Sequence, residues 1–108
     1  MAKLVRTLNT DFSELLSRLE SGILSSSLSA SLEERYDWIG DHARCSVRVF
    51  ERYSAFGGNR LSLTLTLFQE AGGPVSLCAI TAGGSQAVFF KINTISEQSF
   101  LSELERLL

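Results

Sequence analysis

The chain has 108 residues, with 12 acidic and 10 basic side chains and a formal net charge of −2. This length fits one domain of ordinary size, so we expect a single domain over residues 1–108. Hydrophobic residues make up 44% and charged residues 20%, which is typical of a protein that folds around its own core. The slightly acidic balance gives no electrostatic reason to expect a nucleic-acid partner.

The composition also bears on compartment and cofactors. No apolar run reaches the roughly 18 residues of a membrane span, and the first residues lack the pattern of a secretory signal. We therefore expect a cytoplasmic protein that makes no contact with a membrane. Cys45 and Cys78 match no metal-binding or redox spacing, so we expect two reduced, buried side chains. The sequence predicts no metal and no cofactor.

The first part of the chain predicts a strand and then an amphipathic helix. Residues 3–9 alternate in character with the period of a strand. Thr10 or Asp11 can cap a following helix, and Glu14 is placed to complete a capping box from Asp11. Gly22 is the predicted end of this helix. Its buried stripe is predicted from residues at helical spacing: Phe12, Leu15, Leu16 and Leu19.

In the serine-rich segment 25–31, serine alternates with apolar residues, which predicts the start of a strand. Gly40 and Asp41 form a candidate two-residue turn between that strand and the next, 44–53. The resulting register places Asp37 opposite Arg44 and predicts a solvated row of ion-paired arginines. It also puts two carboxylates on the covered side of the sheet, about four residues apart along the strand direction: Glu34 and Glu51.

The second half of the chain predicts two further strands and a hairpin that leads into a final helix. Residues 60–68 alternate leucine with polar side chains, which is typical of a strand with one buried face. Gly83 and Gly84 separate strands 75–82 and 85–92 in the manner of a tight hairpin. A capping box at 94–97 then predicts the start of the last helix. Its apolar stripe is Phe100, Leu101, Leu104, Leu107 and Leu108.

This order predicts an α+β two-layer sandwich, with an antiparallel meander sheet and both helices on one face. The architecture is similar to that of TATA-binding-protein-like and helix-grip domains. The sequence also resembles a family of small bacterial proteins of unknown function. The segments that carry this resemblance are SASLE (29–33), VFERYS (49–54), GGNRLSL (57–63) and AITAGGSQAVFFKINT (79–94). The resemblance implies no activity.

Apolar side chains on the outer face of the predicted sheet are the first candidate site. If helices cover one face only, alternation exposes four of them together: Phe68, Cys78, Ile80 and Phe89. Exposed apolar patches on soluble proteins usually mark a binding surface. A curled sheet, or helices divided between the two faces, would instead cover these residues.

An anion site is the second candidate. Arg52 and Arg60 flank a connection whose glycines, Gly57 and Gly58, could present backbone amides to an anion.

His42 is the single histidine of the chain. Alternation sends the side chain of Cys45 to the other face of the sheet, which disfavours a Cys-His pair, so we expect a surface histidine in a turn.

We therefore expect a non-enzymatic module that self-associates as a dimer through the outer face of its sheet. The alternative is a module that binds an apolar or anionic small molecule between sheet and helices. An enzyme with an unrecognised site is a third possibility.

Overall fold

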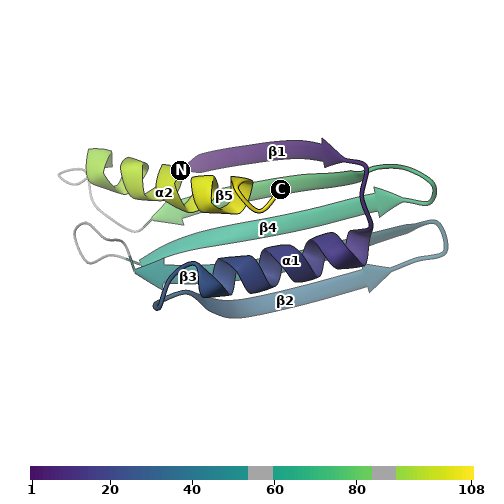
Figure 1. The fold of residues 1–108 in the computed structure, drawn as a ribbon, viewed down its shortest axis with the longest axis horizontal. Coiled ribbons are helices and arrows are strands. Elements are labelled where there is room, and N and C mark those ends of the chain that lie inside the picture. Colours follow the sequence, from purple (N-terminus) through teal and green to yellow (C-terminus); the bar gives the residue numbers. More distant parts are fainter. Residues whose placement is uncertain (54–59, 84–89) are drawn as a thin grey trace.

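The computed structural model describes residues 1–53, 60–83 and 90–108. Its elements are strand β1, helix α1, four further strands and helix α2 (Figure 1). Their bounds are β1 Ala2–Leu8, α1 Phe12–Ser25, β2 Ser31–Ile39, β3 Ala43–Tyr53, β4 Arg60–Glu70, β5 Val75–Gly83 and α2 Phe90–Glu105. This is the predicted α+β fold.

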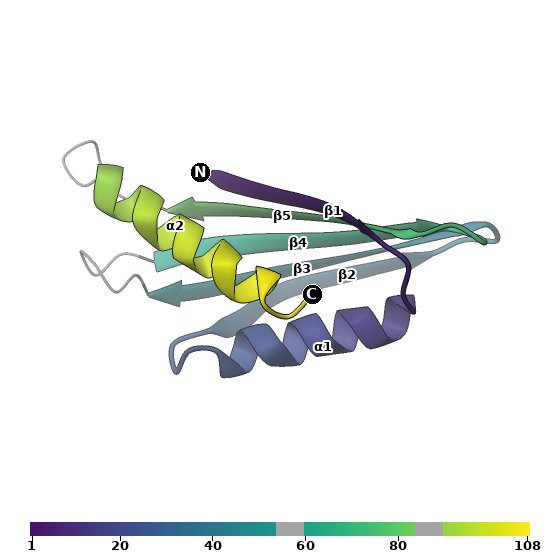
Figure 2. The same ribbon diagram turned by 45° about the horizontal axis from the view of Figure 1, so that its top comes forward.

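The five strands form one antiparallel sheet in the order β1-β5-β4-β3-β2. Strands β2 to β5 are a meander, and β1 adds to it beside β5. Both helices lie on the same face of the sheet, α1 against β3 and β4 and α2 over β5 and β1 (Figures 1 and 2). The sheet therefore has a helix-covered inner face and an outer face that neither helix covers.

The inner face and the helices enclose one core. From β4 it takes the predicted row of leucines, which are fully buried: Leu61, Leu63, Leu65 and Leu67. From the helices it takes buried side chains at helical spacing: Phe12, Leu15, Leu19 and Ile23 of α1, and Phe100, Leu101 and Leu104 of α2. The Asp11 carboxylate accepts a hydrogen bond from the backbone N–H of Glu14 at 2.9 Å, as predicted for the cap.

Helix α1 is longer than predicted, because Gly22 lies inside it rather than at its end. A Cβ atom at Gly22 would lie 2.5 Å from the Leu107 side chain. Glycine at this position therefore allows the C-terminal residues to approach α1 closely. The segment 25–31, predicted as the start of a strand, is also different: Ser25 ends the helix and β2 begins at Ser31.

The turn between β2 and β3 is wider than predicted. Three residues, 40–42, connect the strands, and Ile39 pairs with Arg44. The pairs from Glu34 to Ile39 are shifted by two positions from the predicted register, and those of Ser31 and Leu32 by one. A bulge interrupts the pairing between Leu32 and Glu34. Asp37 consequently faces Ser46 rather than Arg44.

The predicted final hairpin is wrong where the structure describes it. Phe90 to Ile92 form the first turn of α2, which begins before the predicted capping box, and residues 84–89 lie outside the described part. Both edges of β5 are taken by β1 and β4, so that Leu77 pairs with Arg6 and Leu67 rather than with Phe90. The N-terminal strand occupies the place that the sequence pattern assigned to residues 85–92.

Candidate functional site

The outer face of the sheet carries a row of side chains that are apolar except for Thr66. Through the register, Val5 of β1 lies beside Cys78 of β5, and Cys78 lies beside Thr66 of β4. Thr66 in turn lies beside Val47 of β3, which pairs with Tyr36 of β2. The row therefore crosses all five strands, which lie about 4.8 Å apart.

Except for Lys3 and Glu34 at its two edges, the neighbouring positions on this face are also apolar or uncharged. The large exposed side chains are Val5, Tyr36, Trp38, Phe68 and Ile80. Phe68 is 39% and Ile80 37% exposed, although both lie within regular strands. Cys45, Val47, Val49 and Cys78 are half-buried among them. We name this surface, from Val5 to Tyr36 across the sheet, the open face.

Three of the four predicted patch residues lie on the open face, namely Phe68, Cys78 and Ile80. Phe89 lies outside the described residues. The sequence interpretation missed the contribution of β2 and β3, because it assigned Tyr36 and Trp38 to the covered side. The signal was present: these aromatic residues alternate in register with Cys45 and Val47.

The arginine row of β3 lies on the inner face, which corrects the prediction of a solvated row. Arg48 is 5% exposed. Arg44 lies over the ring of Phe12 at 4.0 Å, and Arg52 over the ring of Phe100 at 4.3 Å. Aliphatic stems and flat guanidinium groups can pack on aromatic rings, so the helices cover these cations rather than exclude them.

Carboxylates from the helices and from β2 neutralise the buried arginines. Arg48 donates to Glu20 of α1 through Nε at 3.1 Å and to Asp37 of β2 through Nη1 at 3.0 Å. Arg52 pairs with Glu103 of α2 at 2.7 Å. These ion pairs attach both helices to β3, and the structure gives them a role in positioning the helices.

Asp37 receives two donors, and they alter its titration. The hydroxyl of Ser46 donates a hydrogen bond to Asp37 at 2.6 Å. This bond and then the guanidinium of Arg48 hold the pKa of Asp37 below its ordinary value of 3.8. A carboxyl group whose pKa is lower in the folded than in the unfolded chain stabilises the fold above its unfolded pKa.

Acid is therefore expected to remove the stabilisation that Asp37 provides. The loss begins as the pH falls past the unfolded value of about 3.9 and is complete below the folded pKa. Urea unfolding of the wild type and of Asp37→Asn between neutral pH and pH about 2 measures it. The free energy of unfolding of Asp37→Asn should be lower at neutral pH and should fall less steeply with acid. Parallel curves for the two proteins would contradict this assignment.

The predicted anion site is not assembled by the described residues. Arg52 lies on the inner face with Glu103, whereas Arg60 lies on the outer face and pairs with Glu51. Gly57 and Gly58 lie outside the described residues. The two arginines thus face opposite sides of the sheet, and each is bound to a carboxylate.

The carboxylates Glu34 and Glu51 were predicted on the covered side and lie on the outer face instead. The shifted register also brings them closer, because Glu34 pairs with Val49, two residues from Glu51. Glu51 is engaged by Arg60, while Glu34 is exposed at the β2 edge. In the described part of the chain no cluster of three His, Cys, Asp or Glu side chains could hold a metal ion.

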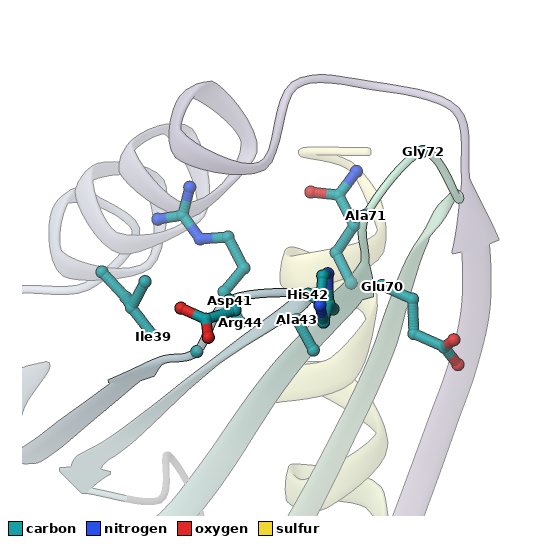
Figure 3. Close-up of a pocket in the computed structure, with 10 residues that line it drawn as sticks. Ile39, Asp41, His42, Ala43, Arg44, Glu70, Ala71 and Gly72 are labelled. Carbon is teal, nitrogen blue, oxygen red and sulfur yellow. The ribbon is translucent and has the colours of Figure 1, made fainter.

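A shallow pocket lies at the end of the sheet where the β2–β3 and β4–β5 turns meet (Figure 3). Its volume is about 210 Å³, below the roughly 300–1,000 Å³ of most small-molecule sites. Asp41 and exposed His42 lie at its centre, whereas the side chain of Glu70 points away from them (Figure 3). A second hollow, of about 390 Å³, lies beside the β4–β5 turn and borders Phe68.

Neither hollow lies between the sheet and the helices, where the inner-face leucines are fully buried. Cys45 is half-buried on the open face, not buried as predicted. Among the described residues, no helix is both long and apolar enough to cross a membrane.

The open face crosses all five strands and is therefore the most extensive candidate surface of the described chain.

Comparison with known proteins gives a family but no activity. No curated protein matches the chain. A family model described as a family of unknown function, DUF6054, matches residues 1–108. The match spans the sheet, both helices and the open face, and this chain belongs to the DUF6054 family.

Proposed function

We propose that this protein is a non-enzymatic module that self-associates as a dimer through the open face. The observation that supports the proposal is that both described helices pack on the inner face. Val5, Tyr36, Trp38, Phe68 and Ile80 then meet solvent together. Exposed apolar side chains that gather on one face of a soluble protein usually mark a binding surface.

The dimensions of the open face suit a dimer interface. Five strands about 4.8 Å apart, each contributing about seven residues at ~3.3 Å, cover roughly 500–600 Å². Two such faces bury roughly 1,000–1,200 Å² in total, at the lower end of specific interfaces. A twofold dimer joins the same surface of both copies, so one sheet face is sufficient for the contact.

The thiols suit a reducing compartment. Cys45 and Cys78 are both free, on strands separated by β4. Exposed or half-buried free thiols are typical of cytosolic proteins rather than secreted ones. We therefore place the dimer in the cytoplasm.

Phe68→Asp is expected to dissociate the dimer. A carboxylate in the middle of an apolar interface loses its hydration without gaining a partner, so the dissociation constant should rise at least about tenfold. Sedimentation velocity over a wide range of concentrations measures the change. A matched control is Ile39→Asp, because Ile39 is 74% exposed but lies on the helix side of β2. The control should dimerise like the wild type.

Thiol labelling gives an independent measurement on the unmodified chain. Cys45 and Cys78 should react more slowly with a thiol reagent as the protein concentration rises, because dimerisation covers both. A wild type that remains a monomer at high concentration would overturn the proposal. So would a dimer that Phe68→Asp leaves unchanged, or native mass spectra in which each single chain carries a co-purified ligand.

A further inference from the structure

Two opposite charges lie at the two edges of the open face, in the same row. Lys3 of β1 pairs with Ile80, and the register continues through Thr64 and Val49 to Glu34 of β2. Both Lys3 and Glu34 are exposed. No ion pair joins either of them to another residue in the described chain.

The other charged side chains of the outer face are at its ends. Arg60 is engaged by Glu51 and lies 3.9 Å from Glu33, beyond the bulge in β2. Glu70 lies at the opposite end, where β4 turns into β5. Among the residues that the structure describes, Lys3 at one edge and Glu34 at the other thus have no ionic partner, and the Glu34 carboxylate accepts a hydrogen bond from the backbone N–H of Arg35 at 2.9 Å.

Strand β4 is the central strand of the sheet, which restricts how two copies can stack. Consider a twofold axis that lies between the two stacked sheets and runs parallel to β4. It reverses the lateral order of the strands, so that β1 of one copy lies over the partner's β2. Positions along the strands do not change, so each row of one copy lies over the same row of its partner. An axis at right angles to the strands would instead set β1 over the partner's β1 and bring like edges together.

We infer that two copies stack about a twofold axis parallel to β4, so that Lys3 of each copy pairs with the partner's Glu34. This arrangement rests on the proposed self-association and specifies its geometry. Aligned sheets cross at about 30°, which offsets the two charges by roughly 5 Å along the strands. A lysine stem spans such an offset.

The same axis gives apolar contacts over the rest of the face. Cys78 of β5 lies over the partner's Val47, and Val5 of β1 lies over the partner's Tyr36. Phe68 is on the central strand, so its ring lies beside the partner's Phe68 on the axis. Opposite charges at the edges and apolar side chains between them resemble the rim and core of protein interfaces.

Charge reversal tests the axis. Lys3→Glu places two carboxylates opposite each other at both edges of the homodimer, and Glu34→Lys places two ammonium groups there. Each variant alone should dimerise about ten- to thirtyfold more weakly than the wild type, since two pairs change from attraction to repulsion. The double variant Lys3→Glu/Glu34→Lys should dimerise like the wild type. An equimolar mixture of the two single variants should form a heterodimer at the protein concentrations at which the wild type dimerises.

The control is Arg106→Glu, which makes the same change in net charge as Lys3→Glu at an exposed residue after α2 and should leave dimerisation unchanged. Sedimentation equilibrium at low salt gives the constants, and the difference should fade near 1 M salt, where the screening length is about 3 Å. A wild-type dimer that Phe68→Asp dissociates, but that neither single reversal weakens, would overturn the axis and leave self-association standing. A wild-type monomer would overturn both.

Discussion

Phe50→Ala is expected to lower the free energy of unfolding by about 3–5 kcal/mol. Phe50 lies in the middle of the inner face of β3, beside Leu63, and its side chain has no exposed surface. Truncation removes a whole ring from the closed core, and the arginines on either side in β3 are held by ion pairs to other elements. The cavity can therefore close only in part.

Urea unfolding followed by circular dichroism measures this loss, at a protein concentration where the wild type is monomeric so that association does not enter. Ile39→Ala is the control, because Ile39 is 74% exposed and its truncation should change stability by no more than about 0.5 kcal/mol. A loss for Phe50→Ala below about 1 kcal/mol would show that β3 does not face the core through this residue.

Arg48→Ala is expected to destabilise the fold by about 2–4 kcal/mol. The guanidinium of Arg48 is buried and binds two carboxylates on different elements, Glu20 and Asp37. The substitution removes the cation that both carboxylates bind. Those carboxylates are 25% and 44% exposed, so water can reach them. The expected loss is therefore smaller than for a fully buried pair.

Arg48→Met separates charge from packing, because it keeps the apolar stem against the sheet and removes the guanidinium. Its stability should lie between those of the wild type and Arg48→Ala. Arg35→Ala is the matched control, since Arg35 is paired with Arg48 in the register but is exposed on β2. If Arg35→Ala and Arg48→Ala lower the free energy of unfolding by the same amount, the buried ion pairs do not hold α1 to the sheet.

Local patterns predicted the strands with one clean face. In β4, leucine alternates with threonine and serine without interruption, so both the strand and its buried side follow from the sequence. The positions of Phe68, Cys78 and Ile80 followed from the same alternation. The antiparallel architecture could be predicted from the glycines in the sequence segments that separate these strands.

The arginines of β3 show what local patterns miss. Hydrophobicity alone assigns Val47 and Val49 to the core and Arg48 to solvent, but the structure has them the other way round. The assignment depends on Phe12, Glu20 and Glu103, which the helices bring from distant parts of the chain. No period within β3 contains that information.

The place of β1 could not be predicted either. Residues 85–92 are rich in strand-forming side chains and follow a glycine pair, so they compete locally for the edge of β5. The structure gives that edge to residues from the other end of the chain. Long-range pairing of this kind depends on the balance of the whole fold rather than on nearby residues.

The pairing of β1 with β5 has a consequence for the order of folding. Ala2 and Thr81 are partners in the sheet, although they are 79 positions apart in sequence. Since β5 follows β1 in the chain, the backbone N–H and C=O groups of β1 cannot pair with β5 until β5 has been made. The meander from β2 to β5 can form from local contacts, whereas closure by β1 pays the entropy of a long loop. The contact of α2 with β1 through Glu105 and Arg6 likewise joins residues that are 99 positions apart in sequence.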